Sequence, residues 1–289
     1  MIDLHIHTIA SSDGQHTPGE IFAMARDAGL TVIAFADHNS VGSVGEGVAL
    51  AARSGIEFIP SIEFNTIFHE QDLHILAYYI DHTSARLARW LEELSREKKD
   101  QAGLRVKKLN ALGFALSMED VDQFAAGRIP TGISFLKAIM SREENRGDER
   151  IRRYVDGDRS DSPYQNFYRD FLRGGKPAFV PLKTVDTFSV MRNIKALGGI
   201  PVLAHPSDTG DEVIRALVEG GLSGLEVFSS YHSAGEEAHF LSLAQVYELV
   251  VTAGSDFHGR AVKPRVTLGG IRGNSIDLVE RLKAARPQS

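Results

Sequence analysis

The chain has 289 residues, 43% of them hydrophobic and 24% charged, which are the proportions of an ordinary soluble globular protein. Its net charge of −6 argues against a protein that coats nucleic acid, and its lack of cysteine excludes disulfides and thiolate metal sites. No apolar run reaches the roughly 20 residues that span a bilayer. Asp3, His5 and His7 interrupt the segment where a secretory signal would lie, so we expect a cytoplasmic protein.

The first 80 residues alternate between strand-like and helix-like patterns. Residues 2–7 read as a strand, and Thr17-Pro18-Gly19-Glu20 is a capping box with proline at the first helical position, which predicts a helix to about residue 28. Further predicted elements are a strand at 31–36, a helix near 44–53, and strands at 56–64 and 73–80. Alternating β and α units predict a mainly parallel sheet with right-handed crossovers.

The pattern changes at about residue 83. A long helical stretch covers 83–113, and helix-like segments continue to about residue 173. Basic residues within 96–108 could contact RNA, but a solvated helix face is the stronger interpretation.

After Gly174-Gly175-Lys176-Pro177 the βα alternation resumes. The strands predicted there are 178–181, 200–204, 224–228 and 249–253. We therefore predict one discontinuous α/β barrel, formed by residues 1–82 and 178–289. The mostly helical insertion at 83–177 is expected to cap the substrate.

His5 and His7 project from the same face of the first strand because side chains alternate along a strand. Two imidazoles at a strand end can share a metal ion, although such a triplet alone is a weak signal. Asp13 follows in the turn sequence Ser11-Ser12-Asp13-Gly14, where a plain turn residue is the alternative interpretation.

Most other predicted strands of the barrel also deliver ligand-type residues. These are His38, which follows Asp37, and Glu63, His74, His205, Asp256 and His258. In parallel βα folds the catalytic face lies at the carboxyl ends of the strands. Any one residue could be a core histidine or a capping carboxylate, but nine together exceed the needs of one ion. Two or three divalent ions of Mn, Fe or Zn are predicted, a set typical of phosphoester hydrolysis.

The ordered motifs resemble the polymerase-and-histidinol-phosphatase (PHP) superfamily. They are HxH with a downstream SDG, then DH, an isolated Glu, a strand His, HP and GSDFH. The resemblance spans both ends of the chain and points to stand-alone phosphoesterases with a helical insertion. These include 3′,5′-nucleoside bisphosphate phosphatases and 5′-to-3′ RNA exonucleases.

The resemblance implies a distorted (β/α)₇ barrel with a trinuclear site. One ion would be held by His5, His7, Glu63 and Asp256, a second by Asp13, His38 and His258, and a third by Glu63, His74 and His205.

The substrate side departs from this pattern. Relatives acting on nucleoside bisphosphates carry a Gly-Arg-x-His segment in the insertion, whereas Gly127-Arg128 is followed here by 129–132 without histidine. Arg128 is still expected to contact phosphate, because a guanidinium binds phosphate bidentately. Lys176 is a second candidate, with a helix stop as its alternative.

Two further residues are assigned supporting roles in catalysis. His232 follows a predicted strand and is expected to donate a proton, with a surface loop role as the alternative. Asp37 is expected to orient a ligand or a bound water.

The favoured hypothesis is therefore a phosphoesterase in which a metal-activated hydroxide attacks phosphorus. The substrate would be a nucleotide, a nucleoside bisphosphate or a short oligonucleotide, without a membrane partner or a stable nucleic-acid complex. One alternative is an amidohydrolase-like C–N or C–O hydrolase with a bridging lysine, for which Lys183 is a poorly placed candidate. The other is a non-catalytic regulatory domain, although structural metal sites are usually closed by four ligands. The specific ester and the oligomeric state stay open.

Overall fold

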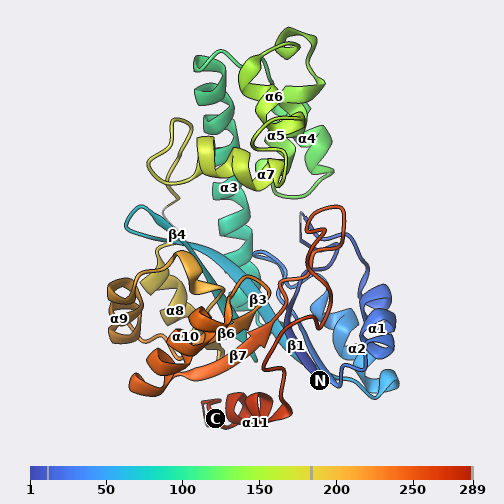
Figure 1. The fold of residues 1–289 in the computed structure, drawn as a ribbon, viewed down its shortest axis with the longest axis vertical. Helices are drawn as coiled ribbons and strands as arrows, with labels where there is room; N and C mark the ends of the chain where they lie inside the picture. Colours follow the sequence, from blue (N-terminus) through green and yellow to red (C-terminus); the bar gives the residue numbers. More distant parts are fainter. Residues whose placement is uncertain (12, 183–184, 288–289) are drawn as a thin grey trace. The chain divides into compact units, whose positions relative to one another are not determined.

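The computed structural model describes residues 1–11, 13–182 and 185–287 (Figure 1). The chain forms two compact units. The first consists of Met1–Thr66, Leu73–Leu91 and Val185–Ser289, and the second of Ile67–Asp72 and Glu92–Thr184. The predicted roles of barrel and insertion, catalysis and substrate capping, stay predictions.

Seven strands form one sheet in sequential order. They are β1 (Ile2–Ile6), β2 (Val32–Phe35), β3 (Glu57–Phe68), β4 (Gln71–Tyr78), β5 (Ile200–Leu203), β6 (Gly224–Ser229) and β7 (Val250–Gly254). A parallel bridge between Ile6 and Phe257 brings the chain after β7 alongside β1. The nearly closed sheet confirms the predicted distorted seven-stranded barrel.

One strand runs against the others within a sheet that is mainly parallel, as predicted. β4 pairs antiparallel with β5, whereas the pairs β1–β2, β2–β3, β5–β6 and β6–β7 are parallel. β3 and β4 are joined by the tight turn His69–Glu70, in which His69 adopts a positive φ of 54°. The beginning of β4, including His74, consequently lies at the edge where the parallel strands end.

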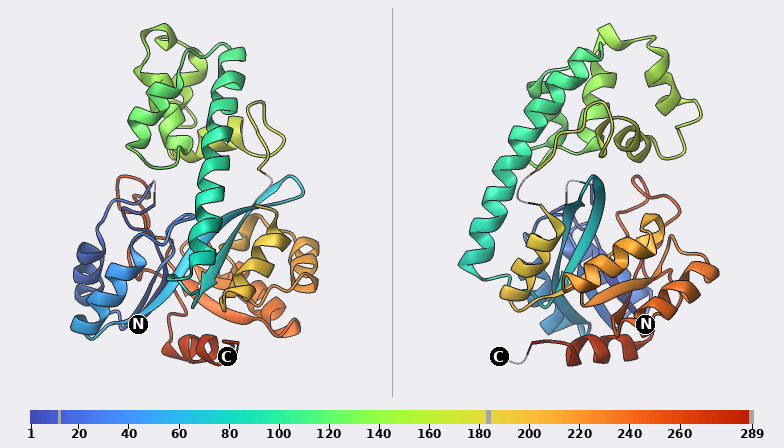
Figure 2. Two further views of the ribbon diagram at one scale, coloured as in Figure 1. Left: turned by 180° about the vertical axis from the view of Figure 1, so that it is seen from behind. Right: turned by 90° about the vertical axis from the view of Figure 1, so that its left-hand side faces the viewer.

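Six α-helices of the described residues lie wholly within the first unit, together with the 3-10 helix η3 (Pro206–Asp208). The six α-helices are α1 (Pro18–Asp27), α2 (Val44–Ser54), α8 (Thr187–Ala196), α9 (Asp211–Glu219), α10 (Ala234–Val246) and α11 (Ile276–Ala284). The predicted capping box at Thr17 is present, and Ser233 forms another at the start of α10. Figure 2 shows the helices arranged around the outside of the strands. Side chains alternate between the two faces of a strand, so the apolar residues Ile2, Leu4 and Ile6 of β1 lie on one face. The other face carries Asp3 and His5, and His7 continues it directly after the strand.

The helix α3 (Ala85–Ala111) begins in the first unit and ends in the second. The other helical segments of the second unit are α4 (Met118–Ala125), α5 (Gly132–Ser141), η1 (Glu143–Asn145), α6 (Glu149–Val155), α7 (Pro163–Phe167) and a π-helix at Tyr168–Leu172. Their own apolar core includes the buried side chains of Leu109, Phe135 and Phe167. None of the helices in the described part of the chain is both long and apolar enough to cross a membrane.

The predicted strand at 178–181 is wrong. Its backbone carbonyls accept hydrogen bonds from α3 side chains instead of from another strand. Gln101 donates to the carbonyl of Val180 at 2.5 Å, and Lys108 donates to that of Phe179 at 2.7 Å.

Candidate metal centre

The structure brings all nine predicted ligand residues together in the first unit. Their candidate ligand atoms form three groups, each lying within 4.8 Å: His7, Asp13, His38 and His258; His5, His7 and Asp256; and His38, Glu63 and His74. The ninth residue, His205, places Nε2 3.4 Å from Glu63 Oε1. His7 and His38 each belong to two groups, so the groups are contiguous.

Glu63 lies at the centre of this arrangement. It is fully buried, and histidine nitrogens face both of its oxygens. Oε1 lies 2.9 Å from His74 Nδ1 and 3.4 Å from His5 Nε2, and Oε2 lies 2.7 Å from His38 Nδ1 and 3.4 Å from His7 Nε2. Burial alone would raise the pKa of Glu63, but the surrounding histidines hold it well below the usual range. A carboxylate in this position can bridge two cations.

Asp256 and His205 reach the cluster through strained backbone. Asp256 follows β7 with φ of 56°, and His205 follows β5 with φ of 28°, values that non-glycine residues rarely adopt. Such conformations cost of order 1–3 kcal/mol and concentrate at functional sites. Asp256 Oδ1 lies 3.1 Å from His7 Nε2 and 3.4 Å from His5 Nε2.

The donor atoms fit divalent cations. Within the described part of the chain, Asp13 Oδ1 is buried without a hydrogen-bond partner, although leaving such an atom unpaired is costly. Asp13 Oδ2 lies 3.6 Å from His38 Nε2 and 3.5 Å from His258 Nε2. Nitrogen and oxygen donors without sulfur suit Mn, Fe or Zn.

The protonation state of His7 also favours metal binding, because its imidazole is neutral near pH 7. Burial lowers the pKa of its imidazole to about 4, with a further contribution from His258 and His38. The ring is therefore neutral near pH 7 and retains a lone pair for a cation.

Glu226 on β6 is a supporting residue that sequence reasoning missed. Its Oε1 lies 2.9 Å from His5 Nδ1, and its Oε2 accepts a hydrogen bond from the backbone N–H of His205 at 2.9 Å. A carboxylate behind a ligating histidine fixes the ring orientation. Its sequence signal was a lone charged residue inside an otherwise apolar strand.

Asp37 contacts the loop that follows β1. Its Oδ1 accepts hydrogen bonds from the backbone N–H groups of Thr8 and Ser11, at 2.7 Å and 3.2 Å. Ser11 Oγ in turn lies 3.0 Å from His7 Nδ1 and accepts from the backbone N–H of His38 at 2.8 Å. These contacts support an orienting role, which stays a prediction.

His232 is buried beside β6 rather than on the surface. Its Nδ1 donates to the carbonyl of Val227 at 2.7 Å, and its ring lies 4.9 Å from that of Phe240. The carbonyl partner fixes the proton on Nδ1. Its role as a proton donor stays a prediction.

Arg128 and Lys176 lie in the second unit. Arg128 Nε donates to the carbonyl of Ala125 at 3.4 Å, and the backbone N–H of Lys176 closes a turn to Arg173. The predicted phosphate contacts of both residues stay predictions. Lys183, the bridging-lysine candidate of the amidohydrolase alternative, lies outside the described residues.

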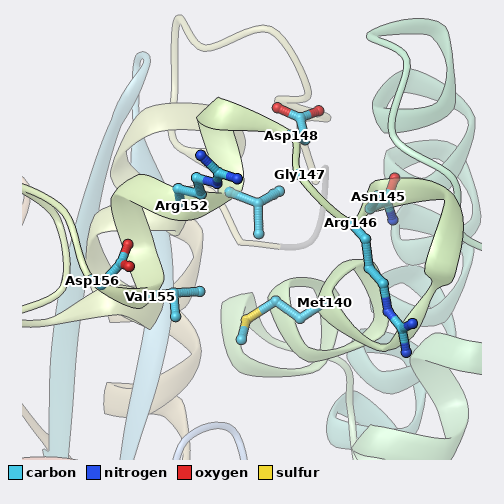
Figure 3. A pocket seen from close by; sticks show the side chains of 9 residues that line it. Met140, Asn145, Arg146, Gly147, Asp148, Arg152, Val155 and Asp156 are labelled. Atoms are coloured by element: carbon cyan, nitrogen blue, oxygen red, sulfur yellow. The ribbon is translucent and has the colours of Figure 1, made fainter.

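The second unit also carries a surface pocket on α5, η1 and α6 (Figure 3). Met140, Arg146, Arg152 and Val155 contribute to its lining. The pocket contains none of the nine ligand-type residues and is separate from the candidate metal centre in sequence.

Comparison with known proteins agrees with this geometry. Residues 3–128, from Asp3 on β1 into the second unit, match the model of the PHP domain family. The chain contains a PHP domain. It is 27% identical to the 3′,5′-nucleoside bisphosphate phosphatase of Chromobacterium violaceum, over 89% of this chain and 87% of the relative. It is 29% identical to a 5′-3′ exoribonuclease of Haemophilus influenzae, over 89% of each chain.

A solved structure has the same fold over almost the whole chain. A protein of Bifidobacterium adolescentis assigned as a metal-dependent phosphoesterase superposes with a TM-score of 0.77 at 22% identity. The match covers 99% of this chain and 96% of that one. The predicted family and the predicted enzyme class, a phosphoesterase, are confirmed by these comparisons taken together. The substrate and the number and identity of the ions stay predictions.

Proposed function

We propose that this chain hydrolyses a phosphate ester of a nucleotide, a nucleoside bisphosphate or a short oligonucleotide. The observation that carries the proposal is Glu63, a buried carboxylate whose two oxygens face histidines from different parts of the chain. The names of the two relatives, a bisphosphate phosphatase and an exoribonuclease, favour a nucleotide-like substrate. We expect the reaction to take place in the cytoplasm.

Two or three divalent ions would be held by the nine residues, with Glu63 shared between ions. When bound, such ions activate water and neutralise the charge that develops on the phosphoryl oxygens. Two of the predicted ligand sets overlap with clusters of donor atoms. The cluster around Asp13 also includes His7, and the cluster around Asp256 includes His5 and His7 but not Glu63. The third includes Glu63 and His74, with His38 or His205 as the further ligand.

The protein's own residues hold this arrangement in place. Glu226 keeps the Nδ1 face of His5 occupied, so that Nε2 points into the cluster. Ser11 does the same for His7, and Asp37 holds Ser11. Arg128 and Lys176 would bind the distal part of the substrate, and His232 would serve proton transfer.

The test is a substrate screen on protein stripped with a chelator and reconstituted with Mn²⁺, Fe²⁺ or Zn²⁺. The panel contains nucleotides, nucleoside 3′,5′-bisphosphates, short RNAs, sugar phosphates, amides and lactones. We expect phosphate ester cleavage that falls by at least about 10²-fold in His7→Ala and in Asp256→Ala, since each removes a group that holds the ions.

His239→Ala is the matched control, because His239 is an exposed histidine paired with Asp211 outside the cluster. It should keep full activity. Undiminished cleavage by His7→Ala at unchanged metal content would refute the mechanism. Turnover of amides or lactones without turnover of phosphate esters would instead favour the amidohydrolase alternative.

A further inference from the structure

Lys263 is the one lysine or arginine that forms an ion pair with any of the nine ligand-type residues in the described part of the chain. Its Nζ contacts Oδ2 of Asp256, and only 13% of its side chain is exposed. Neither the metal assignment nor the predicted substrate contacts include this residue. A lysine this buried needs a partner for its charge, and Asp256 supplies one.

The two oxygens of Asp256 face different partners. Oδ1 lies 3.1 Å from His7 Nε2 and 3.3 Å from His258 Nδ1, so it points into the metal cluster. Oδ2 accepts a hydrogen bond from the hydroxyl of Tyr231 at 2.8 Å and contacts Lys263. The ammonium group of Lys263 therefore contacts one oxygen of the same carboxylate whose other oxygen faces the cluster of ligand-type residues.

Tyr231 fixes the position of the ammonium group further. Lys263 Nζ lies 5.3 Å from the centre of the Tyr231 ring, and that ring packs edge-on against His205 at 5.9 Å. Lys263 is thus held beside the cluster on the side of His205 and Asp256. Tyr231 is 40% exposed, so this side of the cluster reaches the surface of the first unit.

The backbone around Lys263 is an ordered turn. The N–H of Lys263 donates to the carbonyl of Gly259 at 2.9 Å, and that of Ala261 donates to Gln15 Oε1 at 2.8 Å. Gly259 adopts φ of 97°, and a Cβ there would lie 2.3 Å from Gln15 Oε1. Val266 closes the turn and is buried. The position of Lys263 is therefore built into the fold.

We propose that Lys263 binds a non-bridging oxygen of the phosphate group that is cleaved, while Asp256 and Tyr231 hold its ammonium in place. An ammonium has three N–H donors, and the bond to Asp256 uses one of them. Charge-assisted bonds to phosphate are strong, and a fixed donor acts without reorganisation during the reaction. This inference rests on the proposed phosphoesterase function.

The experiment compares Lys263→Met and Lys263→Arg with Lys283→Met in protein loaded with Mn²⁺. Lys283→Met is the matched control, because Lys283 pairs with Glu57 and Glu280 away from the ligand residues. The probe is inorganic phosphate, whose affinity is measured by calorimetry. Metal content and unfolding temperature are measured on the same samples, together with kcat and KM for the best phosphate ester.

Lys263→Met should weaken phosphate binding by about 10-fold or more and lower kcat/KM by about 10²-fold at unchanged metal content. Lys263→Arg should recover part of the phosphate affinity because it keeps a cationic donor. Lys283→Met should match the wild type in all measurements.

Two results would overturn the inference. Wild-type phosphate affinity in Lys263→Met would show that the ammonium does not contact the anion. Loss of bound Mn²⁺ in this variant would show that Lys263 only positions Asp256. If the wild type cleaves no phosphate ester, the proposed function fails on its own, and the phosphate titration still decides the role of Lys263.

Discussion

At the scale of single residues, the candidate centre depends on carboxylates that are not metal ligands as much as on those that are. Glu226 holds the ring of His5 and the backbone of His205 with its two oxygens. Asp3 is similarly buried and accepts hydrogen bonds from both the backbone N–H and the hydroxyl of Ser255. Burial raises the pKa of Asp3 to about 6, despite these hydrogen bonds. Glu226 connects β1 to β6, and Asp3 connects β1 to the segment that follows β7.

Glu226→Gln should weaken metal binding by roughly 10- to 100-fold, the usual effect of losing a partner behind a ligating histidine. Glutamine has one acceptor oxygen and one NH₂ group, so it cannot accept from both His5 and His205. The affinity for Mn²⁺ is measured by competition with a fluorescent chelator. Glu237→Gln serves as the control, because Glu237 pairs with Arg272 instead of with the cluster. Equal Mn²⁺ affinity in both variants would contradict this role.

At the scale of secondary structure, the centre is assembled from strand ends that approach one another closely. β7 lies next to β1, and the N–H of Asp256 donates to the carbonyl of His5 at 2.8 Å. Gly254 is needed at the end of β7, since a Cβ there would lie 2.2 Å from His5 Cβ and 2.6 Å from Glu226 Oε1. The glycine of the GSDFH motif is therefore a packing requirement of the site.

Gly254→Ala should lower the free energy of unfolding by about 1–3 kcal/mol, because the added methyl group overpacks a buried position. It should also lower Mn²⁺ content by displacing His5. Gly235→Ala is the matched control, because the nearest atom to its new Cβ would be 3.9 Å away and the residue lies in α10. In urea unfolding, we expect the free energy of unfolding of that control to be unchanged or higher by up to about 1 kcal/mol. Similar losses at both glycines would argue against a specific clash at Gly254.

At the scale of the whole molecule, metal binding would be coupled to folding, because the proposed ligands come from residues 5 to 258 of the chain. An unfolded chain cannot hold these side chains together, so ions that bind the cluster stabilise the folded state. The first unit should show this effect most directly, because it contains all nine residues.

Addition of Mn²⁺ to chelator-stripped protein should raise the unfolding temperature by roughly 5 °C or more. When the free Mn²⁺ concentration is 100 times the Kd of a site, binding adds about 2.7 kcal/mol to the free energy of unfolding. Scanning calorimetry with and without Mn²⁺ measures the shift, which should become smaller in Glu63→Gln and persist unchanged in Glu237→Gln. An unfolding temperature that does not respond to Mn²⁺ in the wild type would contradict the coupling.

The sequence alone predicted the barrel, the helical character of residues 83–177 and all nine residues of the cluster. Strands and helices follow from local apolar periodicity, as at β1, and the capping box at Thr17 follows from four adjacent residues. The HxH, HP and GSDFH motifs lie at strand ends, where side-chain alternation and chain direction indicate a common edge.

Other features depended on distances between residues far apart in the chain. The reversed direction of β4, the missing strand at 178–181, the bonds of Glu226 and the contact of Lys263 with Asp256 were visible only in the tertiary structure. Local periodicity indicates which side chains share a face, but not which strand lies next to that face. For that reason the sequence determined which donor-type side chains are candidates for the centre, and only the tertiary structure determined that they lie together and which residues hold them in position.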